Sequence, residues 1–337
     1  MKLSREEREA IAVRRLIVNL RAHSIANART LEQKISDAGP YGQRIDPHVL
    51  TSVRQRLEET GRIVRVLHGN VPWFHLPETD PAKVEARLAA QHVVYSKLNA
   101  GTLNKRVGQC LEIATYRALL VGPMNEFQGR YRDLAAHDDS TPYRKEEPQQ
   151  HIGALELHGD QRLDFMVRHS QAGYIGLECK NTRPWLYPHD EDIKEMLRKC
   201  IALDIVPCLI GRRIPFVTFK LLSACGVIMH QTFNQLLPAA DAALAEAAKN
   251  KVLLGYHDIR LGNAADTRML KFITKNLPLI AVEARQKFEG YRDLLAAFAN
   301  NEMAYAEFAG RIRRRANGEP EDFDADTHPP FPDEDEF

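Results

Sequence analysis

Hydrophobic and polar positions repeat with helical spacing in the first part of the chain. Helices are predicted over residues 5–22, 29–38 and 47–60. The first has an apolar stripe made of Ile11, Leu16, Ile17 and Leu20. The second ends at Gly39-Pro40, and the third begins after Asp46, a good N-cap followed by proline. Two apolar segments, IVRVL and VPWFHL, flank the turn His68-Gly69-Asn70 and predict a β-hairpin.

The pattern alternates between helical and strand periods further along the chain. A helix at 81–98 is expected to be a connector, and a second helix covers 105–121. Residues 123–150 are polar and indicate a loop or insertion. Three strands are then predicted in IGALELH, RLDFMVRH and GYIGLECK, followed by a helix at 190–203 and the apolar strands IVPCLIG and ACGVIMH. Residues 233–316 are predicted to be helical, so the expected fold is mixed α/β.

Composition narrows the class of protein. A chain of 337 residues with 44% hydrophobic and 27% charged residues is typical of a globular protein of two or three domains. No segment is apolar enough to span a membrane, and the charged start MKLSREEREA has no signal-peptide apolar region. The five cysteines form no CxxC pair, which favours a reducing cytoplasm over a disulfide framework or a zinc site.

Charge is distributed unevenly along the chain. Residues 318–337 contain nine acidic residues and neither Lys nor Arg, although the whole chain has a net charge of +1. Without them, 46 basic residues face 36 acidic ones, a balance of +10. A basic body is compatible with a polyanionic partner. We expect the tail, 317–337, to be disordered and solubilising rather than an inhibitory mimic of DNA.

Three charged residues interrupt two otherwise apolar strands. Asp164 lies in RLDFMVRH, and Glu178 and Lys180 lie in GYIGLECK. Side chains alternate along a strand, so Glu178 and Lys180 project to the same face. A carboxylate among apolar neighbours is costly unless it is paired or bound to a metal. Adjacent strands are therefore expected to bring two carboxylates and an ammonium group together.

This arrangement resembles the PD-(D/E)XK, or restriction-endonuclease-like, nuclease superfamily over residues 105–232. The resemblance implies a central mixed sheet flanked by helices. It also implies that Asp164, Glu178 and the main-chain carbonyl of Cys179 bind Mg²⁺ or Mn²⁺. Lys180 would orient or activate the attacking water. Glu112, on the helix before the sheet, matches a glutamate that the family carries there. Two features depart from the family pattern: Leu163 precedes the aspartate in place of proline, and the insertion before the first strand is long.

The three helices and hairpin of residues 1–77 resemble a winged helix-turn-helix domain. That resemblance implies that the third helix enters the DNA major groove and that the hairpin contacts the backbone. The exposed face of this helix would present His48, Thr51, Ser52, Arg54 and Gln55, with Arg62 and Arg65 near the hairpin. In the nuclease-like region, phosphate contacts are expected from Asn181, Arg212 and Arg213.

The expected organisation is a DNA-binding domain (1–77), a helical connector (78–104), a nuclease core (105–232), a helical C-terminal region (233–316) and the acidic tail. The expected activity is metal-dependent cleavage of double-stranded DNA in restriction or DNA defence, with a homodimer implied by the resemblance. Repair or recombination nucleases, an RNA-directed nuclease, and a DNA-binding regulator with an inactive nuclease-like domain stay open as alternatives.

Overall fold

The computed structural model describes residues 3–37, 43–124 and 126–321, and the chain forms two compact units. Unit 1 comprises Met1–Lys105 and Ala239–Leu261, and unit 2 comprises Arg106–Pro238 and Gly262–Phe337. Residues 239–261, which we expected in the helical C-terminal region, cluster with the N-terminal part. The predicted helix stop at Gly39-Pro40 and most of the predicted acidic tail lie outside the described residues.

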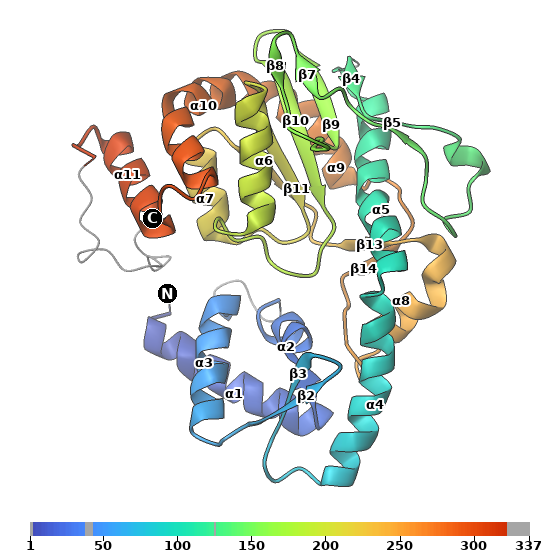
Figure 1. Cartoon of the computed structure of the whole chain (residues 1–337). Coiled ribbons are helices and arrows are strands. Elements are labelled where there is room, and N and C mark those ends of the chain that lie inside the picture. Colours follow the sequence, from blue (N-terminus) through green and yellow to red (C-terminus); the bar gives the residue numbers. More distant parts are fainter. Residues whose placement is uncertain (1–2, 38–42, 125, 322–337) are drawn as a thin grey trace. The chain divides into compact units, whose positions relative to one another are not determined.

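Unit 1 begins with three helices and a small antiparallel sheet (Figure 1). Its elements are α1 (Arg5–His23), β1 (Ala26–Asn27), α2 (Ala28–Ile35), α3 (Pro47–Glu59), β2 (Val64–His68), β3 (Val71–His75), α4 (Pro81–Leu98), η3 (Ala239–Asp241), α8 (Ala242–Lys249) and β14 (Ile259–Leu261). The first three strands are ordered β1-β3-β2. Ser4 and Glu7 form a capping box that starts α1, and the Asn27 side chain caps α2. The predicted helices and hairpin are confirmed, whereas β1 had no recognisable signal in the sequence.

Two helices complete unit 1. Helix α4 packs on the small sheet, where the fully buried Trp73 lies with Ile25, Val84 and Leu88. The Gln91 amide of α4 donates to the carbonyl oxygen of Ile25 at 2.9 Å. Helix α8 packs against α4 through a stretch whose buried residues include Ala245 and Ala248. The late segment 239–261 is therefore a structural part of unit 1.

Unit 2 is built on a five-stranded mixed sheet (Figure 1). The strand order is β12 (Ile228–Gln231), β11 (Val206–Gly211), β10 (Gly173–Lys180), β9 (Phe165–His169) and β4 (Phe127–Gln128). Strands β10, β11 and β12 are parallel, whereas β9 is antiparallel to both β10 and β4. The carboxyl ends of the three parallel strands therefore lie at one edge of the sheet.

Helices cover both faces of this sheet. One face packs against α5 (Gly101–Leu120), α9 (Thr267–Lys271), the π-helical turn η4 (Phe272–Asn276) and the first part of α10 (Leu277–Ala299). The other packs against α6 (Glu191–Ala202), α7 (Phe216–Ala224), α11 (Tyr305–Asn317) and the later part of α10. Gly226 has a φ of +82°, and a Cβ there would lie 2.2 Å from the Ala284 carbonyl oxygen, so α10 passes too closely for any other residue.

The segment between α5 and β9 differs from the prediction. IGALELH is not a strand of the sheet but a small hairpin, β7 (His151–Ile152) and β8 (Leu155–Glu156), whose side chains are exposed or half-buried. Within the predicted loop, β5 (Arg130–Tyr131) pairs antiparallel with β6 (Lys145–Glu146), and η2 (Leu134–Ala136) lies between them. Later in unit 2, β13 (Gln235–Leu237) interrupts the region predicted to be helical. The mixed α/β class is confirmed.

Along the described part of the chain, none of the helices combines the length and the apolar character that crossing a bilayer requires.

Candidate functional site

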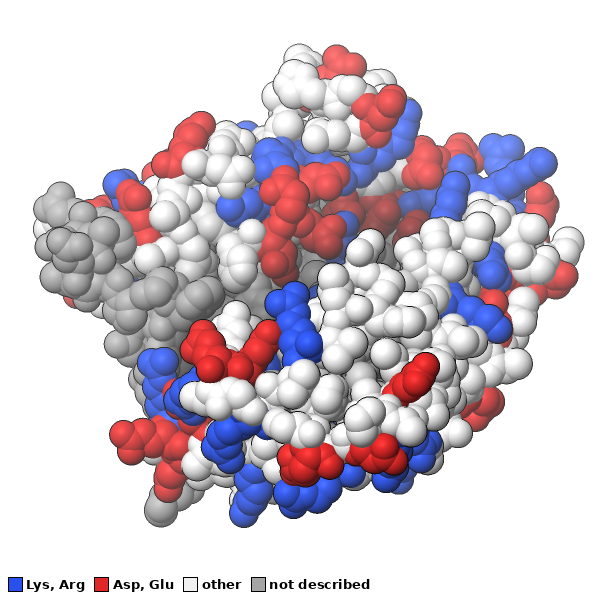
Figure 2. All heavy atoms as spheres, turned by 60° about the horizontal axis from the view of Figure 1, so that its bottom comes forward, with Lys and Arg blue, Asp and Glu red and all other residues white. Residues whose placement is uncertain are grey.

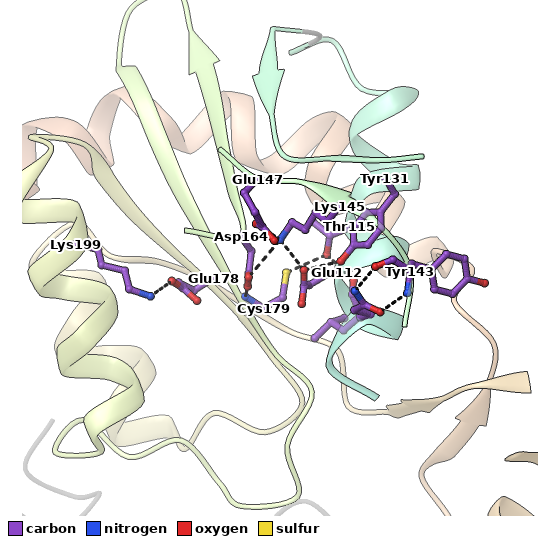
Figure 3. Close-up of polar contacts among 12 residues, drawn as sticks. Glu112, Thr115, Tyr131, Tyr143, Lys145, Glu147, Asp164, Glu178, Cys179 and Lys199 are labelled. Atoms are coloured by element: carbon purple, nitrogen blue, oxygen red, sulfur yellow. Dashed lines mark hydrogen bonds and ion pairs between the residues drawn. The ribbon is translucent and has the colours of Figure 1, made fainter. Parts of the chain in front are cut away.

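Strand β10 carries the centre of the candidate site. Its Leu177 and Cys179 belong to the core on the α5 side, so Glu178 and Lys180 project towards the α6 side. Asp164 immediately precedes β9, and its main-chain N donates to the carbonyl oxygen of Leu177 at 3.1 Å. The Asp164 carboxylate Oδ2 accepts a 2.7 Å hydrogen bond from the main-chain N of Cys179. The two antiparallel strands therefore bring Asp164 alongside the Glu178-Cys179 peptide, as Figure 3 shows.

Glu178 is paired with a buried lysine. Its Oε1 lies 2.8 Å from Nζ of Lys199, and the two side chains are only 5% and 7% exposed. Lys199 also pairs with Glu195, at 2.8 Å. Burial raises the pKa of Glu178, although the cations Lys199 and Lys180 act in the opposite direction. Helix α6 holds Lys199 in place because Met196 and Cys200 anchor the helix in the core.

Lys180 lies at the end of β10 and is less buried. Its Nζ donates to Oδ1 of Asp192 at 2.8 Å, and its side chain is 19% exposed. Burial lowers the pKa of Lys180, but the nearby carboxylates Glu178 and Asp192 outweigh it, so the pKa lies above its usual value. The Lys180 ammonium group is therefore charged near neutral pH and is partly accessible to solvent.

A second lysine lies among three carboxyl groups on the other side of β10 (Figure 3). Nζ of Lys145 is 2.6 Å from Oε2 of Glu112, 3.5 Å from Oε2 of Glu147 and 3.6 Å from Oδ1 of Asp164. The Lys145 side chain is 6% exposed. The hydroxyl of Tyr131, from the strand paired with β6, also donates to Oε2 of Glu112 at 2.6 Å. Carboxylates from α5, from the residue before β9 and from the residue after β6 thus surround one ammonium group.

Burial and like charge make this cluster electrostatically demanding. Burial raises the pKa of Asp164 well above its usual value, and the neighbouring carboxyls of Glu178 and Glu112 add to the rise. Lys145 opposes it. For Lys145 itself, burial lowers the pKa, but Asp164 and Glu112 more than compensate and raise it. The close carboxyl groups act on both residues: their mutual repulsion adds to the effect of burial on Asp164, and their attraction for the Lys145 cation outweighs the effect of burial on that lysine.

The donor chemistry suits a divalent metal ion. Asp164, Glu178 and Glu112 offer carboxylate oxygens, the ligands that Mg²⁺ and Mn²⁺ prefer. Within the described residues, however, no three His, Cys, Asp or Glu side chains are arranged to hold a metal ion. The carboxyl groups are bound to Lys145 and Lys199 instead. The sequence had indicated neither lysine.

The residues predicted to contact phosphate near this site are engaged with the protein itself. Asn181 is buried, and its amide donates to the carbonyl oxygens of Val107 and Leu236 at 2.6 and 2.7 Å. Arg212, 2% exposed, donates through Nε to the Thr182 carbonyl oxygen at 3.1 Å. The Arg213 guanidinium lies 5.2 Å from the centre of the Phe233 ring. These side chains hold the chain after β10 and β11 in place.

In unit 1, the predicted DNA-contacting residues lie on α3 and next to the hairpin. The side chains of His48, Ser52, Gln55, Arg62 and Arg65 are exposed, and those of Thr51 and Arg54 are half-buried. The Arg54 guanidinium lies 4.5 Å from the centre of the Phe74 ring, and Arg65 is 3.8 Å from Glu58. Acidic and basic side chains are interspersed over the face drawn in Figure 2. On that face, basic side chains therefore alternate with acidic ones instead of forming a continuous basic surface.

No family model, curated protein or solved structure gives a significant match to this chain.

Proposed function

We propose that this protein is a Mg²⁺- or Mn²⁺-dependent nuclease that hydrolyses phosphodiester bonds in double-stranded DNA. The observation that carries the proposal is the grouping of Asp164 and Glu178 on adjacent strands, with Lys180 beside Glu178 on the same face. The main-chain hydrogen bond from Cys179 ties Asp164 to the segment that carries Glu178, and burial raises the pKa of both carboxyl groups. Perturbed carboxyl pKa values of this kind are typical of functional sites.

The order of elements in unit 2 supports the same proposal. Helix α5 precedes the antiparallel strands β4, β9 and β10, and helix α6 then leads to β11, which is parallel to β10. This mixed sheet with helices on both faces resembles the restriction-endonuclease-like core. Glu112, on α5, is part of the carboxyl cluster with Asp164, which agrees with a role for that glutamate in the same site.

In this proposal, Asp164, Glu178, Glu112 and the carbonyl of Cys179 would hold the metal ion. A bound divalent ion lowers the pKa of a coordinated water and stabilises negative charge on a phosphate. Lys180, charged and partly exposed, would orient the attacking water and contact the scissile phosphate. Lys199 would keep the Glu178 carboxylate in position from α6. The hydrogen bond from the main chain of Cys179 fixes Asp164 next to Glu178.

Unit 1 would supply DNA affinity. Its order of helices and strands, with β1 between α1 and α2 and a hairpin after α3, resembles a winged helix-turn-helix domain. The exposed His48, Ser52 and Gln55 of α3 can face base edges, and Arg62 and Arg65 can contact the phosphate backbone. Restriction or another form of DNA defence is the role we propose, and a homodimer would explain cleavage of both strands.

The test is cleavage of plasmid and phage DNA with Mg²⁺, with Mn²⁺ and with EDTA, for the wild type and for Lys180→Ala and Glu178→Gln. A side chain that takes part in proton transfer commonly contributes about 100- to 10,000-fold in rate, and the loss of a metal ligand is expected to be at least as damaging. We therefore expect both variants to be inactive at the same concentration. Lys194→Ala is the matched control, because Nζ of Lys194 on α6 donates to Asn301, away from the carboxyl groups. Equal cleavage by all variants, or cleavage in EDTA, would refute the proposal.

A DNA-binding regulator is the second candidate. The observation that favours it is that lysine ammonium groups already occupy the carboxyls of Asp164 and Glu178. A regulator would shift DNA on a gel through unit 1 and leave it intact with either metal. Substitutions at Arg62 or Gln55 would then weaken the shift, whereas Glu178→Gln would not change it.

A further inference from the structure

We propose that Lys145 is a tethered cation of the candidate metal site, which neutralises its carboxyl groups before metal binds and is displaced when a divalent ion enters. This inference depends on the proposed function for the identity of the metal. It concerns a residue that lies outside the Asp164, Glu178 and Lys180 motif.

The contacts of Lys145 are those of a bound cation. Three carboxyl groups from three separate parts of the chain face its single ammonium group, at 2.6 to 3.6 Å. The aromatic face of Phe165 lies 5.0 Å from the same nitrogen and adds a cation–π contact. One positive charge among three carboxyl groups leaves an excess of negative charge. A divalent ion would neutralise the cluster more completely than Lys145 does.

The support of Lys145 allows it to leave. Lys145 belongs to β6, a strand of two residues that pairs with the equally short β5 outside the five-stranded sheet. Lys199 is different, because it is held by α6, whose neighbouring side chains are packed in the core. A two-residue ladder has few main-chain hydrogen bonds to lose, although Tyr131 of β5 is itself packed in the core, whereas Lys199 is carried by a 12-residue helix whose side chains are packed in the core. Displacement is therefore expected at Lys145 and not at Lys199.

A fixed point next to Lys145 limits this movement. The side chain of Gln109 on α5 accepts from the main-chain N of Tyr143 at 2.7 Å and donates to its carbonyl oxygen at 2.9 Å. Both Tyr143 contacts are buried. The chain is therefore anchored two residues before Lys145, so the lysine can swing away and return without loss of the surrounding segment.

Metal binding in the absence of DNA tests the inference. The full chain is titrated with Mn²⁺, and free ion is followed by electron paramagnetic resonance for the wild type, Lys145→Met and Lys194→Met. Competition between two cations should disappear in Lys145→Met, so its Kd for Mn²⁺ is expected to fall about 5- to 150-fold, the usual range of coupling between linked events. Lys194→Met should bind like the wild type. An unchanged or higher Kd in Lys145→Met overturns the inference.

Two further measurements cover a variant that folds poorly. Lys145→Arg keeps the positive charge and should bind Mn²⁺ no more tightly than the wild type. In the wild type itself, hydrogen exchange at the amides of β5 and β6 should accelerate when Mn²⁺ is added, because displacement of Lys145 loosens the ladder. Slower exchange or no change there would show that Lys145 stays in place, and the inference would be wrong.

These measurements separate the two proposals. Tighter Mn²⁺ binding by Lys145→Met, in a protein that cuts no DNA, would support the tethered cation and refute the nuclease. Metal-dependent cleavage with equal Mn²⁺ affinity in the wild type and Lys145→Met would support the nuclease and refute the tethered cation.

Discussion

On each side of strand β10 a carboxyl group of the candidate site is paired with a buried lysine, but different elements support the two lysines. On the α6 side, Glu178 is paired with Lys199, which a core-packed helix carries. On the α5 side, Asp164 shares Lys145 with two glutamates, and short strands carry the lysine. Lys199 faces one buried and one partly exposed glutamate, whereas Lys145 lies among three carboxyl groups. One half of the candidate site is therefore built to stay in place and the other to exchange its cation.

The largest expected effect concerns the ion pair between Lys199 and Glu178 on the α6 side of β10. Lys199→Met removes the partner of the buried Glu178, and breaking a buried ion pair on one side commonly costs about 3–5 kcal/mol of folding free energy. The free energy of unfolding, measured by urea denaturation, should fall by that amount. Lys194→Met on the same helix, where the lysine is partly exposed, should lose about 1 kcal/mol or less. Equal losses in the two variants would break the contrast.

Substitution of two glycines, Gly129 and Gly176, tests the two sides of β10 at the level of the main chain. A Cβ at Gly129, where φ is +93°, would lie 2.5 Å from the carbonyl oxygen of Asp164. At Gly176, on the α6 side, it would meet the side-chain ends of Ile205 and Leu163 at 2.7 and 2.8 Å. Side-chain ends can shift and main-chain atoms cannot. We expect Gly176→Ala to lower the free energy of unfolding by about 1–3 kcal/mol, and Gly129→Ala to lower it further.

The affinity for Mn²⁺ gives a second comparison between Gly129→Ala and Gly176→Ala. Gly129→Ala displaces the main chain of Asp164 and should weaken Mn²⁺ binding, whereas Gly176→Ala should leave it nearly unchanged. Gly290→Ala, inside α10 with open space around it, is the control and should be neutral or stabilising by up to about 1 kcal/mol. A greater loss of stability in Gly176→Ala than in Gly129→Ala would contradict this prediction.

The smallest expected effect is a change in the pH dependence of stability. The folded state raises the pKa values of Asp164 and Glu178, so between the ordinary and the raised pKa it binds more protons than the unfolded state. The free energy of unfolding contributed by each carboxyl therefore falls as pH rises through that interval. The slope is at most about 1.4 kcal/mol per pH unit for one group.

Neutral variants should flatten this slope. Asp164→Asn should flatten it more than Glu178→Gln, because the Asp164 pKa is raised well above its usual value while Lys199 and Lys180 oppose the rise at Glu178. Urea denaturation at several pH values from 5 upwards, without added metal, measures the slopes. The reverse order would show that the two sides of β10 do not differ as their ion pairs indicate.

Local patterns were enough to predict part of the candidate site. Alternation along a strand places Glu178 and Lys180 on the same face, and the structure has both within β10. Asp164 and Glu178 can be recognised in the sequence because each interrupts an otherwise apolar segment. The helices of unit 1 and the strands β9, β10 and β11 were predictable for the same reason, since each has a clear period of apolar residues.

The partners of those carboxyls could not be predicted in the same way. Lys199 lies 21 residues from Glu178, and Lys145 lies 33 residues from Glu112. No repeat spacing connects such positions, because tertiary packing brings them together. Strands β5 and β6 have two residues each, too few to show a period of two, so the segment that carries Lys145 was interpreted as a loop.

The discontinuous sequence of unit 1 has a consequence for how the chain is made. Helix α4 receives its partner α8 from residues 239–261, and the side chain of Gln33 on α2 lies 3.2 Å from a ring nitrogen of His257. During synthesis the first 105 residues leave the ribosome long before that segment. The α4 surface that α8 covers therefore stays exposed to solvent until residues 106–238 of unit 2 have been translated. During this interval the exposed surface is available to a chaperone.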